Sequence, residues 1–296
     1  MKSGPILSIV IALPGEVSLS PEYQDFIDET LATSETEVVL AFSSAWEFDK
    51  FRSDSPILRV YSPDNRSLLK LWGMGLSAAS GKYLATLDAR CPPAPNWIHT
   101  ARKNIISEPS CFYGSVETKW AMGNINLLGY LIEYAQFKAP VSCISEYPGN
   151  NIVFKAELLD DQPTLSRLGF QKTFMLWRLE KSTGVKPHYS TDMPVFYGKE
   201  YSIPEYFFHL FRHGRCFASN RLSQVNQPSR IVCILFSPFV GILRIFRLFR
   251  NVFRKPSLLL STILYFPLIF LAEHSWALGE FLGYGFGDGG ACDRLE

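Results

Sequence analysis

The sequence predicts an α/β protein in which a mixed sheet is flanked by helices and is followed by apolar and amphipathic helices. Two observations support this fold class. Short apolar runs rich in β-branched residues, typical of buried strands, alternate with segments of helical character over the first part of the chain. After residue 229 the composition changes to apolar stretches rich in Phe. We therefore expect one α/β domain over residues 1–225 and a helical segment with its tail over residues 226–296.

The first strand of the predicted sheet ends at a clear turn signal, Pro14 and Gly15, and the second ends at Ser43. A helical segment at residues 68–80 precedes the strand that delivers Asp88. This order is typical of a nucleotide-binding sheet, whose expected strands occupy residues 7–12, 37–42, 57–61 and 83–87.

Composition limits the classes of function. A chain of 296 residues and 33.5 kDa holds one sizeable α/β domain plus an appendage. The total of 29 Lys and Arg against 28 Asp and Glu leaves no charge bias, so nothing in the sequence favours a nucleic-acid partner.

The six cysteines are widely scattered, with no C-x-x-C pair and no Cys/His grouping at metal-site spacing. Residues 1–5 lead directly into an apolar run of strand type, without the pattern of a secretory leader. We therefore expect reduced, mostly buried thiols and a domain in the cytosol.

The segment at residues 81–97 carries the most specific motif. A strand ends in Asp88, Arg90 follows two residues later, and a Pro-rich loop leads through Asn96 to Trp97. This resembles the segment of family 2 glycosyltransferases in which a strand ends in Asp-x-Asp. Weaker similarities follow in the family's order at residues 148–155, 174–179, 195–197 and 206–217. The resemblance implies the GT-A fold, a Rossmann-like mixed sheet of nucleotide-diphospho-sugar transferases.

The resemblance also implies a donor site that has changed. In the family the second Asp of Asp-x-Asp holds a divalent metal, and this position is Arg90, which cannot ligate Mg²⁺ or Mn²⁺. The family's His ligand aligns with Tyr197, and the acids that contact the nucleoside align near Ser43. We expect no metal site and no cofactor, with Asp88, Arg90 and Ser43 as the candidate donor site for a nucleotide sugar. Arg90 is expected to meet Asp88 or a neighbouring carboxylate.

The base position has changed as well. The family's Glu-Asp pair, which supplies the general base, aligns with Gln171 and Lys172, and a lysine does not accept a proton at neutral pH unless burial or a neighbouring cation lowers its pKa. If the site is inactive, Lys172 should face solvent or form a salt bridge. Glu146 is the alternative base, while Asp161 more simply belongs to a polar turn.

The C-terminal segment has a distinct composition. Apolar runs at residues 231–243 and 258–272 flank a basic run at 244–255, and each apolar run is shorter than the roughly 20 residues that cross a bilayer core. Arg and Phe recur at helical spacing in the basic run, which suits a helix lying on an anionic membrane. We expect peripheral or re-entrant association through residues 231–272 at the cytoplasmic face. A helical subdomain, or a docking surface for a membrane protein of glycan assembly, remains the alternative.

The resemblance leaves two functions open. One is a degenerate, non-catalytic member (a pseudoenzyme) that serves as scaffold or regulatory subunit in surface glycan or polysaccharide assembly. The other is an active, metal-independent transferase of the hexosyltransferase type, moving a sugar from a nucleotide-sugar donor to a lipid-linked or glycan acceptor. Loss of the polar functional positions beside a retained scaffold favours the first. The sequence does not identify the sugar, nucleotide, acceptor or oligomeric state.

Overall fold

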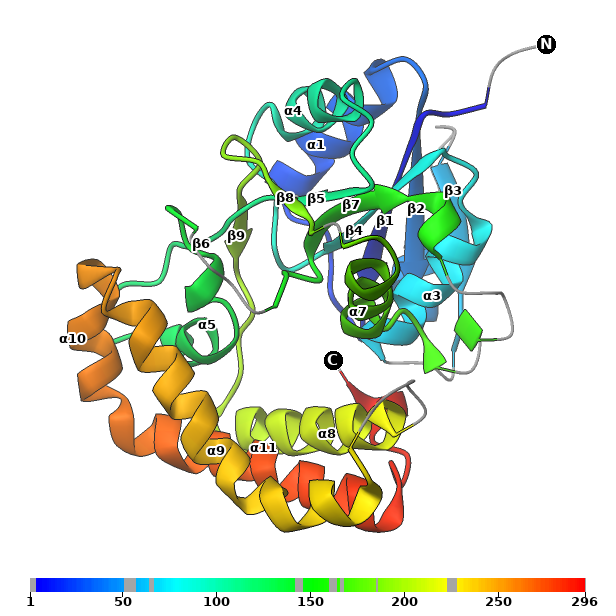
Figure 1. Cartoon of the computed structure of the whole chain (residues 1–296). Helices are drawn as coiled ribbons and strands as arrows, with labels where there is room; N and C mark the ends of the chain where they lie inside the picture. The colour runs from blue at the N-terminus through cyan, green and yellow to red at the C-terminus, as the bar shows by residue number, and fades with distance from the viewer. Residues whose placement is uncertain are drawn as a thin grey trace. The chain divides into compact units, whose positions relative to one another are not determined.

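A computed structural model describes residues 4–50, 57–63, 67–141, 146–159, 164–165, 168–184, 186–222 and 228–295 (Figure 1). Contacts divide the chain into two compact units. The α/β unit holds residues 1–117 and 137–198 with Glu296, and the helical unit holds residues 118–136 and 199–295. The predicted boundary at residues 225 and 226 falls outside the described residues.

The α/β unit is built on a seven-stranded mixed sheet, which confirms the predicted fold class. The four N-terminal strands pair in parallel, and β7 pairs antiparallel with both β4 and β5. In β1 the register places Ala12 opposite both Ala41 and Asp88, so β1, β2 and β4 end at one edge. In spatial order the strands are β3 (Ile57–Tyr61), β2 (Thr36–Phe42), β1 (Leu7–Leu13), β4 (Tyr83–Asp88), β7 (Asn151–Lys155), β5 (Cys111–Tyr113) and β8 (His188–Tyr189).

Helices cover both faces of this sheet (Figure 1). On one face α1 (Pro21–Ala32) and α4 (Trp97–Ile105) meet through an edge-to-face contact of Phe26 and Trp97. On the other, α3 (Leu68–Ala78) and α7 (Lys172–Thr183) bury apolar side chains against Val10 and Ile152. The remaining elements are α2 (Ala45–Lys50), the 3-10 turns η1 (Ala135–Phe137) and η2 (Ala156–Leu158), and a two-stranded sheet of β6 (Val116–Thr118) and β9 (Val195–Tyr197).

The helical unit centres on α8 (Ile203–Arg221), which packs along α11 (Phe266–Phe286). A capping box of Ser202 and Glu205 starts α8, satisfying backbone N–H groups at its first turn. Glycines let the two backbones approach closely, since a Cβ on Gly279 would lie 2.1 Å from the Phe211 carbonyl oxygen. The unit also contains α5 (Leu127–Glu133), α9 (Arg230–Val252), α10 (Pro256–Leu264) and the 3-10 turn η3 (Cys292–Arg294).

A disulfide joins Cys216 in α8 to Cys292 in η3. The prediction that all cysteines are reduced is therefore wrong for this pair. The two cysteines lie 76 residues apart in sequence, a separation at which spacing gives no sign of pairing. Cys91, Cys111 and Cys233 are buried free thiols, as expected.

The apolar and basic runs at residues 231–255 were predicted as separate segments, but most of both lies in one helix, α9, of 23 residues. Among the described residues α9 is the one helix long and apolar enough to cross a membrane by length and composition. A second span would need α10 and α11 together, and they are bent by 81°. Arg244 is turned inward, where its guanidinium contacts Glu273 and the Trp276 ring. The expectation that the arginines of this segment form a stripe for a membrane is therefore wrong for Arg244.

Candidate active site

The candidate donor site lies where β1, β2 and β4 end. Ser43, directly after β2, accepts a hydrogen bond at 2.7 Å from the backbone N–H of Gly15. The Tyr23 hydroxyl donates to the backbone oxygen of Asp88 at 2.9 Å, and the N–H of Ala89 donates to Ala12 at 3.1 Å. The carboxyl ends of parallel strands are the usual ligand-binding edge of an open α/β sheet, so the predicted residues lie along a suitable edge.

Asp88 and Arg90 form a two-pronged ion pair, which confirms the predicted pairing. The Nε and backbone N–H of Arg90 donate to Oδ1 of Asp88 at 3.0 Å each, and Nη2 donates to Oδ2 at 2.9 Å. The Asp88 side chain is fully buried, whereas that of Arg90 is 15% exposed. Both carboxylate oxygens are therefore already engaged by a permanent cation.

This arrangement does not fit the divalent metal that the fold family implies. A metal bound by Asp88 would have to displace Arg90 while leaving its positive charge next to the ion. Tyr197 in β9, which aligns with the family's His ligand, is fully buried, and its phenol supplies no imidazole nitrogen to a metal. Asp88, Arg90 and Tyr197 therefore do not form a divalent-metal site at this edge of the sheet.

The predicted base position lies at the start of α7. Nζ of Lys172 donates to the backbone oxygen of Tyr147, and Gln171, the N-cap residue, donates through Nε2 to the Leu168 oxygen at 3.0 Å. The prediction of an exposed or salt-bridged Lys172 is wrong, because its ammonium binds a carbonyl and its stem passes close to Gly149. Burial lowers the pKa of Lys172, and the nearby Glu146 carboxylate partly opposes that shift.

A pocket opens beside this lysine and brings Lys172 together with Glu146. It encloses about 490 Å³, part of it open to solvent, and Glu180 and Lys186 also line it. The other lining residues are Tyr147, Thr173, Leu176 and Trp177. The structure thus groups the candidate site residues into two sets, Asp88, Arg90 and Ser43 at the strand ends and Glu146 and Lys172 at the pocket. Asp161 lies outside the described residues.

Asn151 holds the segment that resembles the family's acceptor side. Its buried amide accepts from Trp97 Nε1 at 2.9 Å and donates to the backbone oxygens of Ser115 and Met193 at 2.8 and 2.6 Å. Thr86 of β4 donates to the Gly149 oxygen at 2.7 Å. These bonds tie the 148–155 segment to β4, to the start of α4 and to the backbone at Ser115 and Met193, so Asn151 builds the scaffold.

Two polar groups in the structure are not among the predicted site residues. Glu47 in α2 is 8% exposed and accepts a hydrogen bond from Ser18 at 2.7 Å. The sequence gives little sign that Glu47 is buried, because a carboxylate on a short helix is usually solvated. Glu133, His209 and His213 meet within the helical unit, and the signal for that group was the i, i+4 spacing of the two histidines.

The comparisons with known proteins agree with this fold. No family model and no curated protein matches the sequence. Among solved structures, the mannosyltransferase PcManGT from Pyrobaculum calidifontis, in complex with GDP-Man and Mn²⁺, has a TM-score of 0.55 at 12% identity, over 96% of this chain and 88% of that one. The chain therefore has the GT-A fold of glycosyltransferases.

Two further structures match less closely. S. aureus TarS 1–349 gives a TM-score of 0.41 at 12% identity, over 93% of this chain and 90% of that one. Glucosyl-3-phosphoglycerate synthase from Mycobacterium tuberculosis gives 0.45 at 13%, over 68% and 75%. With TM-scores below 0.5, these two structures add nothing to the fold assignment made from PcManGT.

Proposed function

We propose that this chain is a degenerate family 2 glycosyltransferase homologue that no longer transfers sugar and serves as a scaffold or regulatory subunit in surface glycan assembly. The observation that carries the proposal is the Asp88–Arg90 ion pair. In this pair Arg90 engages the Asp88 carboxylate, which a metal-dependent transferase would use to bind its ion. Scaffold positions of the GT-A sheet are kept while this polar position is changed.

The residue types at the base position support the same proposal, although Lys172 is neither exposed nor salt-bridged, as an inactive site was expected to leave it. An inverting transfer needs a carboxylate that takes the proton from the acceptor hydroxyl. Gln171 and Lys172 stand there, and both side chains donate hydrogen bonds to backbone carbonyls. They act as structural ties at the start of α7.

One observation favours the alternative, an active and metal-independent transferase. Glu146 and Lys172 line the same pocket, so a carboxylate is available close to the altered base position. In that mechanism Glu146 would take the proton from the acceptor hydroxyl as the new glycosidic bond forms, and Arg90 would stabilise the departing nucleoside diphosphate. Asp88 would then orient Arg90.

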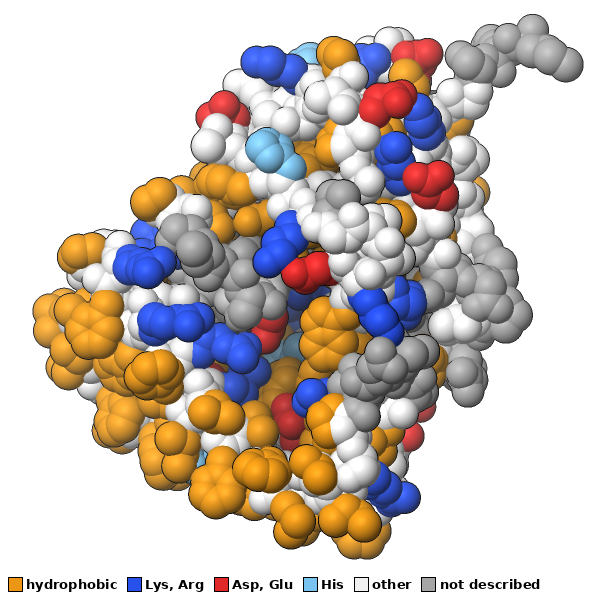
Figure 2. All heavy atoms as spheres, viewed as in Figure 1, with side chains coloured by type: hydrophobic (Ala, Val, Ile, Leu, Met, Phe, Trp, Pro, Cys, Tyr) orange, Lys and Arg blue, Asp and Glu red, His pale blue; other side chains and the backbone are white. Residues whose placement is uncertain are grey.

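We also propose that the helical unit associates with a membrane, at the cytoplasmic face that the sequence predicts. Figure 2 shows hydrophobic side chains gathered over the region of α9, α10 and α11. On α9, Leu235, Phe239 and Phe246 are 64%, 57% and 69% exposed. Exposed apolar side chains at this density mark an interaction surface. Together with the arginines near the end of α9, these apolar side chains favour an anionic membrane as the partner. A membrane protein of glycan assembly is the second partner that this surface allows.

Isothermal titration with UDP-, GDP- and dTDP-sugars, each with and without Mn²⁺, tests the proposal. We expect Mn²⁺ to make no difference to binding and the purified protein to transfer or hydrolyse none of these donors. Binding tighter than about 100 μM, roughly −5.5 kcal/mol, that requires Mn²⁺ would contradict the loss of the metal site. Sugar transfer that Asp88→Ala abolishes would establish the active alternative instead.

A further inference from the structure

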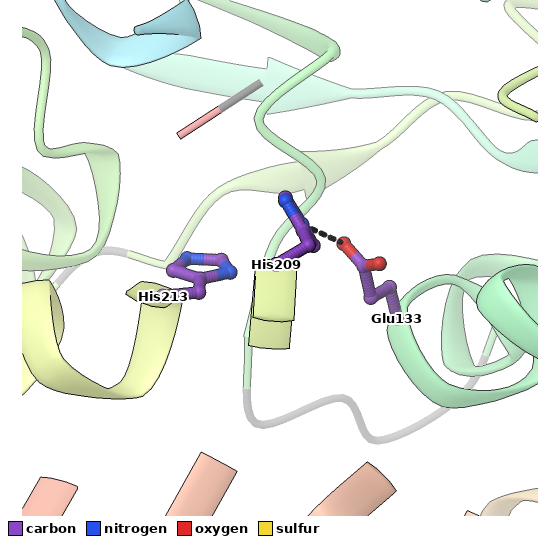
Figure 3. A group of neighbouring side chains, drawn as sticks. All are labelled: Glu133, His209 and His213. Atoms are coloured by element: carbon purple, nitrogen blue, oxygen red, sulfur yellow. Dashed lines mark ion pairs between the residues drawn. The ribbon is translucent and has the colours of Figure 1, made fainter. Parts of the chain in front are cut away.

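Two histidines and a glutamate converge inside the helical unit (Figure 3). His209 and His213 are four residues apart on α8, so both side chains project from one face of that helix. Glu133 is the last residue of α5. One ligand atom from each of the three side chains lies within 4.8 Å of the other two.

The spacing of these groups leaves room for an ion. His209 Nε2 and Glu133 Oε2 lie 3.8 Å apart, an ion pair if the imidazole is protonated but beyond hydrogen-bond range (Figure 3). Two ligands of a tetrahedral zinc ion, each bound at about 2.0–2.1 Å, lie about 3.3 Å from one another. Side-chain movements on the order of half an ångström would therefore bring these two atoms to zinc-binding positions.

Burial gives these groups a reason to bind a partner. The His209 and Glu133 side chains are only 10% and 13% exposed. Within the part of the chain that the structure describes, His209 Nε2 and Glu133 Oε1 are buried and make no hydrogen bond. A buried polar atom left unsatisfied costs about 1–3 kcal/mol, a cost that metal ligation would remove.

Aromatic neighbours hold both imidazole rings in place. The His209 ring stacks on Tyr201 at a centroid distance of 5.3 Å, and the His213 ring lies 4.6 Å from the Trp276 ring. Because the rings are oriented by packing, the site is organised before an ion arrives.

The donor set selects among cations. Two imidazoles and one carboxylate favour a metal with strong imidazole affinity, whereas Mg²⁺ and Ca²⁺ prefer sites built from oxygen ligands.

We propose that Glu133, His209 and His213 form a site for a divalent transition-metal ion of the zinc class, which links α5 to α8 within the helical unit. Two imidazoles and one carboxylate are typical zinc ligands, and three protein ligands leave a fourth position for water. The site is separate in sequence and in donor set from the Asp88 position, where the fold family binds its metal. It does not depend on whether the chain transfers sugar.

Metal titration of the full-length protein tests the site. After chelator treatment and dialysis, we expect one equivalent of Zn²⁺ to bind and to raise the melting temperature, with no such effect from Mg²⁺. Co²⁺ should give the intense visible absorption of a low-coordinate nitrogen and oxygen site. His209→Gln, His213→Gln and Glu133→Gln should each weaken Zn²⁺ binding at least tenfold.

The matched control is His188→Gln, which removes an exposed histidine of the α/β unit and should leave Zn²⁺ binding unchanged. Circular dichroism identifies any variant that fails to fold. If a variant does not fold, the Co²⁺ spectrum of the wild-type chain decides whether the site binds a metal. Zn²⁺ binding of equal strength in His209→Gln and in wild type would overturn the proposal. So would a wild-type chain that binds neither Zn²⁺ nor Co²⁺.

Discussion

Arg244 of α9 and Glu273 of α11 form a buried ion pair, with their side chains 17% and 2% exposed. The Arg244 guanidinium also lies 4.0 Å from the centre of the Trp276 ring. A basic residue from a segment rich in exposed Phe thus points into the helical unit, where it holds α9 against α11. Arg244 therefore belongs to the inner face of α9, and the exposed apolar side chains form its outer face.

Removing one partner of this pair should destabilise the helical unit strongly. Glu273→Ala leaves Arg244 buried without its carboxylate, and breaking such a pair costs about 3–5 kcal/mol. The double variant Arg244→Met with Glu273→Met removes both charges and should stay much closer to wild type. Urea unfolding of the single and double variants measures the difference. An equal loss of unfolding free energy in the single and double variants would show that the two side chains stabilise the unit only by filling space and not through their charges.

Restoring the Asp-x-Asp motif should create a metal dependence. Arg90→Asp removes the cation paired with buried Asp88 and adds a second carboxylate, so the variant should melt at a lower temperature in chelator. Mn²⁺ should recover part of that loss in Arg90→Asp and none in wild type. Arg90→Gln is the control, since it removes the charge without adding a ligand. Recovery of both variants by Mn²⁺ would place the ion elsewhere.

Serine substitutions on the outer face of α9 should release the protein from lipid. Burying one such Leu or Phe side chain contributes about 1.5–3 kcal/mol, so Leu235→Ser, Phe239→Ser and Phe246→Ser should each weaken binding to anionic vesicles about tenfold or more. Flotation with phosphatidylglycerol-containing vesicles measures this. Trp46→Ser and Ile106→Ser, at exposed sites of the α/β unit, are the controls. Unchanged flotation of the α9 variants would exclude this surface.

Stability should depend on the protonation of Lys172 in alkaline solution. Burial lowers its folded-state pKa below the ordinary 10.5. Between those two values the unfolded chain binds more protons than the folded one, so stability rises with pH through that window. Lys172→Met should remove this rise, as urea unfolding from pH 7 to 10.5 would measure. A rise of the same size in the variant would assign it to other groups.

Much of the sheet could be predicted because its signal is local. The runs at residues 7–12, 37–42, 57–61 and 83–87 are mainly apolar, as buried strands are, and they became β1 to β4, of which β3 at the sheet edge is only partly buried. Asp88 and Arg90 could be paired in advance because two residues at the end of a strand are neighbours whatever the rest of the chain does. The fold class and this ion pair followed from the sequence.

What could not be predicted depends on contacts between distant segments. Lys172 binds the Tyr147 oxygen because α7 packs beside that loop, and no pattern in either segment specifies the contact. The same holds for the Cys216–Cys292 disulfide and for the inward turn of Arg244, whose partner lies on another helix. The grouping of Glu133 in α5 with His209 and His213 in α8 could not be predicted for the same reason.

The glycine contacts between α8 and α11 bear on the order in which the chain is made. Gly214, Gly279 and Gly283 bring the two backbones together, yet the helices are separated by α9 and α10 in sequence. During synthesis, α8 leaves the ribosome well before the surface that covers it. The α/β unit has all its strands by residue 197 and can fold as a unit at that stage. Until α11 emerges, the face of α8 that α11 later covers stays exposed.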